Sequence, residues 1–319
     1  MLKNLAFAIS LLCSYSCFAQ KLLYSETETT FPKKDTIDSN KNKIIAISAV
    51  HALAISSSYF IMNEAWYKGY AKTSFHLKND NDNWQQMDKA GHTWTTYQYS
   101  RLSTEVWRYA GLKRIPSAIA GTISGISMQT MMEILDGHSA QWGFSWGDMA
   151  ANGIGALTFS LQEIFLNQQI VSIKMGYTQE KYPTQHLKDR AKEIYGESFG
   201  QRILKDYNSQ TYWASVNIQS IIKKNSFPSW LNLAFGYGTS GMYGAVHNSW
   251  AEMYNHPIPD GALNRTRSFY ISPDISLSRI HTNKKWLKSI LFVADMIKIP
   301  APTLEYNNRH KWIFRPLFM

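Results

Sequence analysis

The stretch PSAIAGTISGISMQTMMEILD, residues 116–136, decides the first half of the fold. Its first residue, Pro116, is of the type favoured in the first turn of a helix, and Gly137 directly after it is a stop signal. Ser117, Gly121 and Gly125 recur every four residues. Small residues at that spacing let a second helix approach closely. The stretch therefore predicts a helix that packs tightly against another helix.

Further helices are expected on both sides of this stretch. The loop-like LKNDNDN places Asp82 or Asn83 to cap a helix over residues 84–109. The short connection HSAQWGF leads to Ser145 and the helical segment WGDMAANGIGALTFSLQEIFL, which makes the second and third helices antiparallel neighbours. Upstream, residues 44–62 are uncharged but rich in Ala and Ser, with His51 near the middle. They favour a buried or half-embedded helix over an inner-membrane span.

Beyond residue 210 the pattern changes to that of strands. YWASVNIQSI sets Val216, Ile218 and Ser220 alternating to one side, and WLNLAFGYG and SFYISPDISLSRI follow. Pro273 predicts that the last of these runs is an edge or a bulged strand. KWLKSILFVADMIKI predicts a helix, and PAPTLEY and KWIFRPLFM predict extended segments. The expected fold class is α+β: an N-terminal bundle of apolar helices followed by a small antiparallel β region with an added helix.

The chain is expected to have five consecutive parts. Lys3, the apolar run after it and the small residues before Gln20 are typical of a secretory signal peptide over residues 1–19. Cys17 is not preceded by the aliphatic residue that a lipoprotein signal needs. The other parts are a flexible leader (20–41), a helical domain (42–166), a charged helical connection (167–209) and a C-terminal β-rich region (210–319).

Charge and cysteine content narrow the chemistry. The formal net charge is +10 and is spread along the chain, which favours a basic surface facing anionic lipid head groups or other envelope components. No nucleic-acid recognition motif accompanies the charge, so nucleic acid is not expected as a partner, while a protein partner is possible. Both cysteines, Cys13 and Cys17, lie in the expected signal peptide. Disulfides, cysteine nucleophiles and thiolate metal sites are therefore excluded from the exported chain.

Three helices carry ionisable or amide side chains among apolar and small residues. The first has Asp88, Lys89 and His92; the second has Gln129, Glu133 and Asp136; the third has Asp148 and Asn152. Their spacing puts each set on one helical face.

Two interpretations of these three stripes stay open. In one, Asp88 orients His92 as a base, and Glu133 with Asp148 serves as a general acid or binds a hard cation, with Asp136 as a further carboxylate. In the other, the residues form a structural network: Asp148 in SWGD closes a helix start, and Asp88 is favoured by the helix dipole. The sequence names neither a metal nor a cofactor.

The motifs MDKAGHTWTTYQYSR, EILDG and GFSWGDMAANGIG, in this order, resemble the predicted periplasmic lipoprotein family of unknown function, YfiM type, over about residues 84–165. They are more weakly similar to VanZ-like membrane proteins. The resemblance implies an envelope location and brings no established reaction. It marks as shared residues Asp88, His92, Glu133, Asp136, Asp148 and Asn152.

Two functions are expected on these grounds. The first is an exported envelope protein at the periplasmic face of the outer membrane, or integral to the envelope membrane, with a structural or lipid-associated polar helix cluster and C-terminal strands that form a packing or partner surface. The second is a hydrolase or transferase that acts on an envelope lipid or glycan carrier through His92 and the acidic residues.

Overall fold

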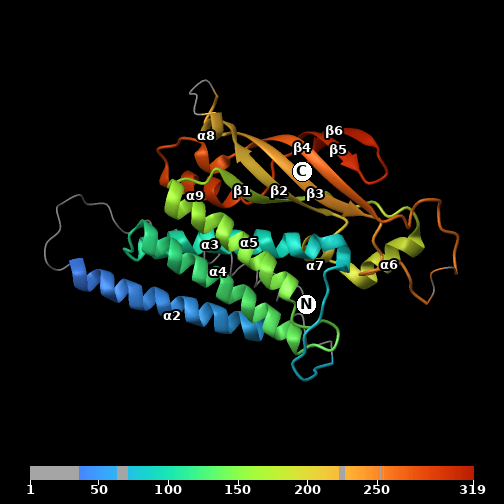
Figure 1. The fold of residues 1–319 in the computed structure, drawn as a ribbon, viewed down its shortest axis with the longest axis horizontal. Helices are drawn as coiled ribbons and strands as arrows, with labels where there is room; N and C mark the ends of the chain where they lie inside the picture. The colour runs from blue at the N-terminus through green and yellow to red at the C-terminus, as the bar shows by residue number, and fades with distance from the viewer. Residues whose placement is uncertain (1–35, 63–70, 223–226, 252, 254) are drawn as a thin grey trace. The chain divides into compact units, whose positions relative to one another are not determined.

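The computed structural model describes residues 36–62, 71–222, 227–251, 253 and 255–319 (Figure 1). The expected signal peptide and most of the expected leader lie outside these residues. Within the described part the chain is α+β, as expected, with helices first and a six-stranded antiparallel sheet after them. It divides into a helical unit, which holds residues up to Asn79 together with Thr95–Gln169, and a sheet unit of Asp80–Trp94 and Ile170–Met319.

The helical unit contains α2 (Thr36–Met62), most of α3 (Met87–Tyr109), α4 (Arg114–Gly137) and α5 (Trp146–Leu161), which ends in a π turn over Gln162–Leu166. In this unit α4 packs against both α2 and α5. α2 begins within the stretch expected to be a flexible leader.

The small residues of α4 bring it close to α3, as their spacing predicted. A Cβ added at Gly121 would lie 2.6 Å from the amide nitrogen of Thr104 and 2.8 Å from the carbonyl oxygen of Ser100. A Cβ at Gly125 would lie 3.1 Å from the amide nitrogen of Ser100. Only glycine therefore fits where the two helices meet.

Burial on α4 and α5 is the reverse of that in a water-soluble bundle, in which a helix turns its apolar face inward. On α4, Ser117, Ser124 and Gln129 are buried, whereas Ile119 and Ile123 are 47% and 59% exposed. On α5, Asp148 and Asn152 are buried, and the exposed side chains include Ile154, Leu157 and Leu161. Within the described ranges, no helix has both the length and the apolarity needed to cross a bilayer.

The start of α3 differs from the sequence expectation. A left-handed turn over Asn83–Gln86 precedes the helix, with positive φ at Trp84, Gln85 and Gln86, so α3 begins only at Met87. Asp82 makes no capping hydrogen bond with its side chain. The hydroxyl of Tyr237 donates to the carbonyl oxygen of Gln85, which holds this turn against the sheet of the same unit.

The sheet unit contains six strands in chain order: β1 (Val171–Tyr177), β2 (Gln210–Asn217), β3 (Leu231–Ser240), β4 (Thr266–Ile275), β5 (Ala301–Asn307) and β6 (Trp312–Phe318). Each pairs antiparallel with the next, and Figure 1 shows them side by side. The two edge strands, β1 and β6, approach each other at one end of the sheet. There the hydroxyl of Thr178, directly after β1, lies 3.5 Å from the carbonyl oxygen of Met319, directly after β6.

Three details of the strands were not expected. β1 lies in the stretch that was expected to be a charged helical connection. The strand was not expected because Lys174 interrupts its apolar run. β2 ends at Asn217, and the short helix α8 (Ile218–Ile222) follows, so the alternation expected to continue through Ile218 and Ser220 is wrong. Pro273 lies in β4, an internal strand; the ladder with β5 stops at Ile271, so no partner there needs the missing N–H.

The remaining helices of the sheet unit agree with the sequence pattern. The charged stretch forms α6 (Gln185–Tyr195) and α7 (Phe199–Lys205), which are separated at Gly196, where φ is +88°. The added helix is α9 (Lys285–Ala294).

Candidate functional site

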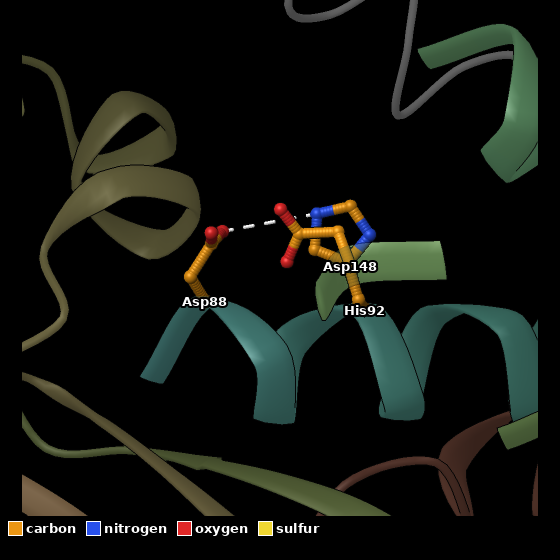
Figure 2. A group of neighbouring side chains, drawn as sticks. All are labelled: Asp88, His92 and Asp148. Atoms are coloured by element: carbon orange, nitrogen blue, oxygen red, sulfur yellow. Dashed lines mark ion pairs between the residues drawn. The ribbon is translucent and has the colours of Figure 1, made fainter. Parts of the chain in front are cut away.

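Asp88 and His92 lie one turn apart on one face of α3. The Nε2 atom of His92 lies 3.8 Å from Oδ1 of Asp88, which is longer than a hydrogen bond (Figure 2). The same carboxylate oxygen accepts a hydrogen bond of 3.1 Å from the hydroxyl of Tyr207. Both side chains of the pair are partly exposed, at 22% and 16%. The tyrosine therefore fixes the carboxylate, while the imidazole remains within reach of solvent.

Lys89 lies beside this pair and adds a positive charge. Its Nζ atom is 2.6 Å from Oδ1 of Asp80 and 3.4 Å from Oδ2 of Asp88. The lysine thus links the start of α3 to the loop before it. An ammonium shared by two carboxylates offsets their mutual repulsion.

Glu133 serves the start of α5. Its side chain is fully buried, and its Oε2 atom accepts a hydrogen bond of 3.1 Å from the backbone N–H of Ser145. The hydroxyl of Ser145 in turn accepts from the backbone N–H of Asp148, at 3.1 Å. Half of the capping box expected in SWGD is thus present. The bond that would complete it within the motif goes to Glu133 of α4 instead.

Asn152 links α5 to α3 and α4 within the helical unit. Its Oδ1 atom accepts hydrogen bonds from the hydroxyl of Thr96 at 2.9 Å and from the side-chain amide of Gln129 at 3.3 Å. The network therefore joins α3, α4 and α5. Asp136 lies one turn beyond Glu133 in α4 and is half-buried.

A second acidic centre in the helical unit was missed. Glu163 is buried in the turn after α5, forms an ion pair with Arg108, and accepts a hydrogen bond of 3.1 Å from the side-chain amide of Gln169. Arg114 donates to its backbone carbonyl oxygen. The signal was a single glutamate in the apolar run LQEIFL, which is costly to bury without a cation.

A group of titratable side chains in the sheet unit was also missed. Burial, and next the charge of Asp206, raises the pKa of Glu180 to about 7. Burial likewise raises the pKa of Asp206, although the hydroxyl of Tyr182 donates to it at 2.8 Å and Arg202 pairs with it at 3.1 Å. These residues come from separate segments, so no local motif indicates the group.

The segment with all three polar stripes carries the family signature. Residues 75–164 match the family described as predicted periplasmic lipoprotein (DUF2279). This confirms the resemblance given by the three motifs, and it supports an exported, periplasmic location. The similarity to VanZ-like proteins stays a prediction. No curated protein and no solved structure matches the chain.

The DUF2279 match covers the helical hairpin of α4 and α5 and the whole of α3. It thus includes every residue of the three stripes, and the sheet from β1 onward lies beyond it.

Proposed function

We propose that the protein is an exported cell-envelope component that associates with a membrane through its helical unit, and that the buried polar cluster of this unit is structural. The supporting observation is the reversed burial on α4 and α5. In lipid, apolar side chains can face outward at no cost, whereas polar side chains must turn to the interior and bond there. In water, the exposed side chains of Ile115, Ile119 and Ile123 would bury little apolar surface and so would contribute little to the stability of the fold.

The hydrogen bonds of the cluster support a structural role. Glu133 satisfies a backbone N–H at the start of α5, where the helix dipole favours a carboxylate. Asn152 receives donors from two other helices. A buried polar group that loses its partner costs about 1–3 kcal/mol, so these contacts fix the register of the three helices. Catalysis would need Glu133 to exchange protons, which conflicts with its bond to Ser145.

Membrane extraction tests this proposal. In cells that express the tagged chain, the native protein should remain in the membrane pellet after alkaline carbonate. The double variant Ile119→Asn/Ile123→Asn should move to the soluble fraction, because it places two amides where lipid would lie. Ser127→Asn is the matched control, since Ser127 is the exposed residue one turn further on the same face. If the double variant is as resistant to extraction as the control, this proposal is wrong.

A second candidate function is a cation-assisted hydrolase or transferase, and the pairing of His92 with Asp88 on α3 favours it. Nε2 of His92 and Oδ1 of Asp88 lie 3.8 Å apart, and both side chains are partly exposed, so solvent or a substrate can reach them.

Tyr207 holds the carboxylate of Asp88 by a hydrogen bond and Lys89 lies beside it, so this carboxylate can orient the imidazole of His92. An imidazole beside a carboxylate suits a divalent cation such as Zn²⁺ or Mn²⁺.

Calorimetric titration with Mn²⁺ and with Zn²⁺ tests this second function. One stoichiometric site is expected, which His92→Ala and Asp88→Asn should each abolish. His247→Ala, the loss of an exposed histidine elsewhere, should leave it intact. If the native protein binds neither ion, the cation-assisted function is wrong.

A further inference from the structure

Most of the side chains that β3, β4 and β5 bury are polar and lie beside the aromatic cluster of Trp213, Tyr270 and Phe318, while many apolar side chains of these strands face outward. Antiparallel sheets with one solvated face normally show the opposite arrangement. Along β3, β4 and β5 the buried side chains include Asn232, Ser268, Asp274, Thr303 and Glu305. The residues between them are exposed; together with one residue of β6 they form what we call the outer sheet face: Leu233, Phe235, Phe269, Ile271, Leu304 and Phe314.

Buried ion pairs lock this arrangement. The ammonium of Lys174 lies 2.9 Å from Oδ2 of Asp274 and 2.8 Å from Oδ1 of Asp295, and the ammonium of Lys298 lies 3.5 Å from Oδ1 of Asp274. All four side chains are at most 2% exposed. A slip of one residue would turn every side chain of a strand to the other face and leave these charges unpaired. The exposure of the apolar residues is therefore a property of the fold.

The outer sheet face is continuous across neighbouring strands. In register, Phe235 of β3 pairs with Ile271 of β4, Ile271 with Leu304 of β5, and Leu304 with Phe314 of β6. At the β1 and β2 end the same side of the sheet is covered, because Met87 at the start of α3 packs there. The apolar side thus has a covered part and an open part.

Aromatic and then basic residues border the open part at one end. Tyr306 and Trp312 continue the row of Phe269 across β5 and β6, and on the other side this row runs into the covered part at Tyr237. Directly beyond this row, the hairpin between β5 and β6 exposes Arg309, His310 and Lys311, and the Tyr306 hydroxyl lies 2.9 Å from Nδ1 of His310. Hydrocarbon contact, an aromatic row and basic side chains follow each other in this order at the surface of a lipid leaflet.

The dimensions fit one leaflet. Phe269 and Pro273 are four residues apart on the outer side of β4, and strands rise about 3.3 Å per residue, so the apolar rows extend about 13 Å. This is less than half of the hydrocarbon thickness of about 30 Å.

We propose that the outer sheet face inserts into one leaflet of an anionic bilayer, with the β5–β6 hairpin at the lipid phosphates. This rests on the proposed membrane association, but on residues of the other unit. Charge complementarity selects lipid over a second copy of the chain. A second copy would offer a matching apolar face but no counter-charge for the hairpin, whereas an anionic lipid offers both.

Site-specific labelling tests this proposal on the full chain. Cys13 and Cys17 are the only cysteines, so their replacement by serine leaves a background without thiols. A polarity-sensitive dye is attached to Ile271→Cys on the outer sheet face, to Ile119→Cys on α4, or to Glu193→Cys on α6 as an exposed polar control. Vesicles of phosphatidylglycerol and phosphatidylethanolamine are then added, with and without brominated acyl chains.

We expect the dye at 271 to shift to the blue and to be quenched by the bromine, while the dye at 193 does neither. Arg309→Ser/Lys311→Ser should weaken binding to these vesicles about 30-fold and leave the weaker binding to neutral phosphatidylcholine unchanged. A blue shift that depends on protein concentration without vesicles would show self-association and overturn the proposal. If the dye at position 119 responds and the dye at position 271 does not, insertion of the outer sheet face is wrong, while membrane association through the helical unit stands. If only the dye at position 271 responds, the outer sheet face inserts and the helical unit does not.

Discussion

Gly121 is the position where α3 and α4 come closest, and its replacement by alanine should destabilise the helical unit. The new Cβ would lie 2.6 Å from the amide nitrogen of Thr104 and 2.8 Å from the carbonyl oxygen of Ser100. Both are backbone atoms, so no side-chain rotation relieves the clash and the helices must separate. Overpacking of this kind costs about 1–3 kcal/mol, against which alanine gains up to about 1 kcal/mol in helix propensity. Together these give a net loss of about 0–3 kcal/mol in the free energy of unfolding, centred on about 1.5 kcal/mol.

Gly153 on α5 provides the matched control. A Cβ added there meets nothing within 4 Å, so Gly153→Ala should keep the propensity gain and stabilise the protein by about 0.5–1 kcal/mol. Urea unfolding followed by far-ultraviolet circular dichroism measures both variants against the native chain. Equal stability of Gly121→Ala and Gly153→Ala would show that α3 and α4 do not meet this closely.

Three further predictions concern buried polar groups. Glu180 has a pKa of about 7 in the folded protein against 4.5 ordinarily, so the folded state holds more protons between these values and stability should fall as pH rises through them, by at most about 3 kcal/mol. Glu180→Gln should flatten this dependence in urea unfolding at pH 5, 6, 7 and 8. Asn152→Ala removes the acceptor shared by two helices and should cost about 1–3 kcal/mol in the same assay, whereas an unchanged midpoint would argue against the network. Lys174→Met leaves Asp295 without its paired cation and should cost about 3–5 kcal/mol, with most of it recovered when Asp295→Asn is added, because Asp274 keeps the ammonium of Lys298.

Local spacing was enough to predict part of the helical unit. The four-residue recurrence of Ser117, Gly121 and Gly125 indicated the close helix contact, and SWGD indicated the cap of Ser145. The hydrogen bond of Glu133 with the backbone N–H of Ser145 could not be predicted from local spacing, because it depends on how closely the end of α4 approaches the start of α5. The sequence placed Asp148 in that bond, and only the tertiary fold assigns it to Glu133.

The sheet was harder to predict because its polarity is reversed. A lysine in VSIKMGY argues against a buried strand unless its acidic partners are known, and those lie far away in β4 and after α9. The alternation in WLNLAF and SFYIS was visible, but alternation alone does not say which face is buried. The usual rule, that an antiparallel sheet buries its apolar face and exposes its polar face, predicts that Phe235 and Ile271 are buried.

Fractionation of the native, tagged protein tests the central claim of membrane association most directly. After osmotic shock, the membrane pellet is washed with high salt, which removes proteins held only by charge. The reversed burial in both units predicts that the protein stays in the pellet through both steps. Release into the periplasmic extract by osmotic shock alone would contradict the account.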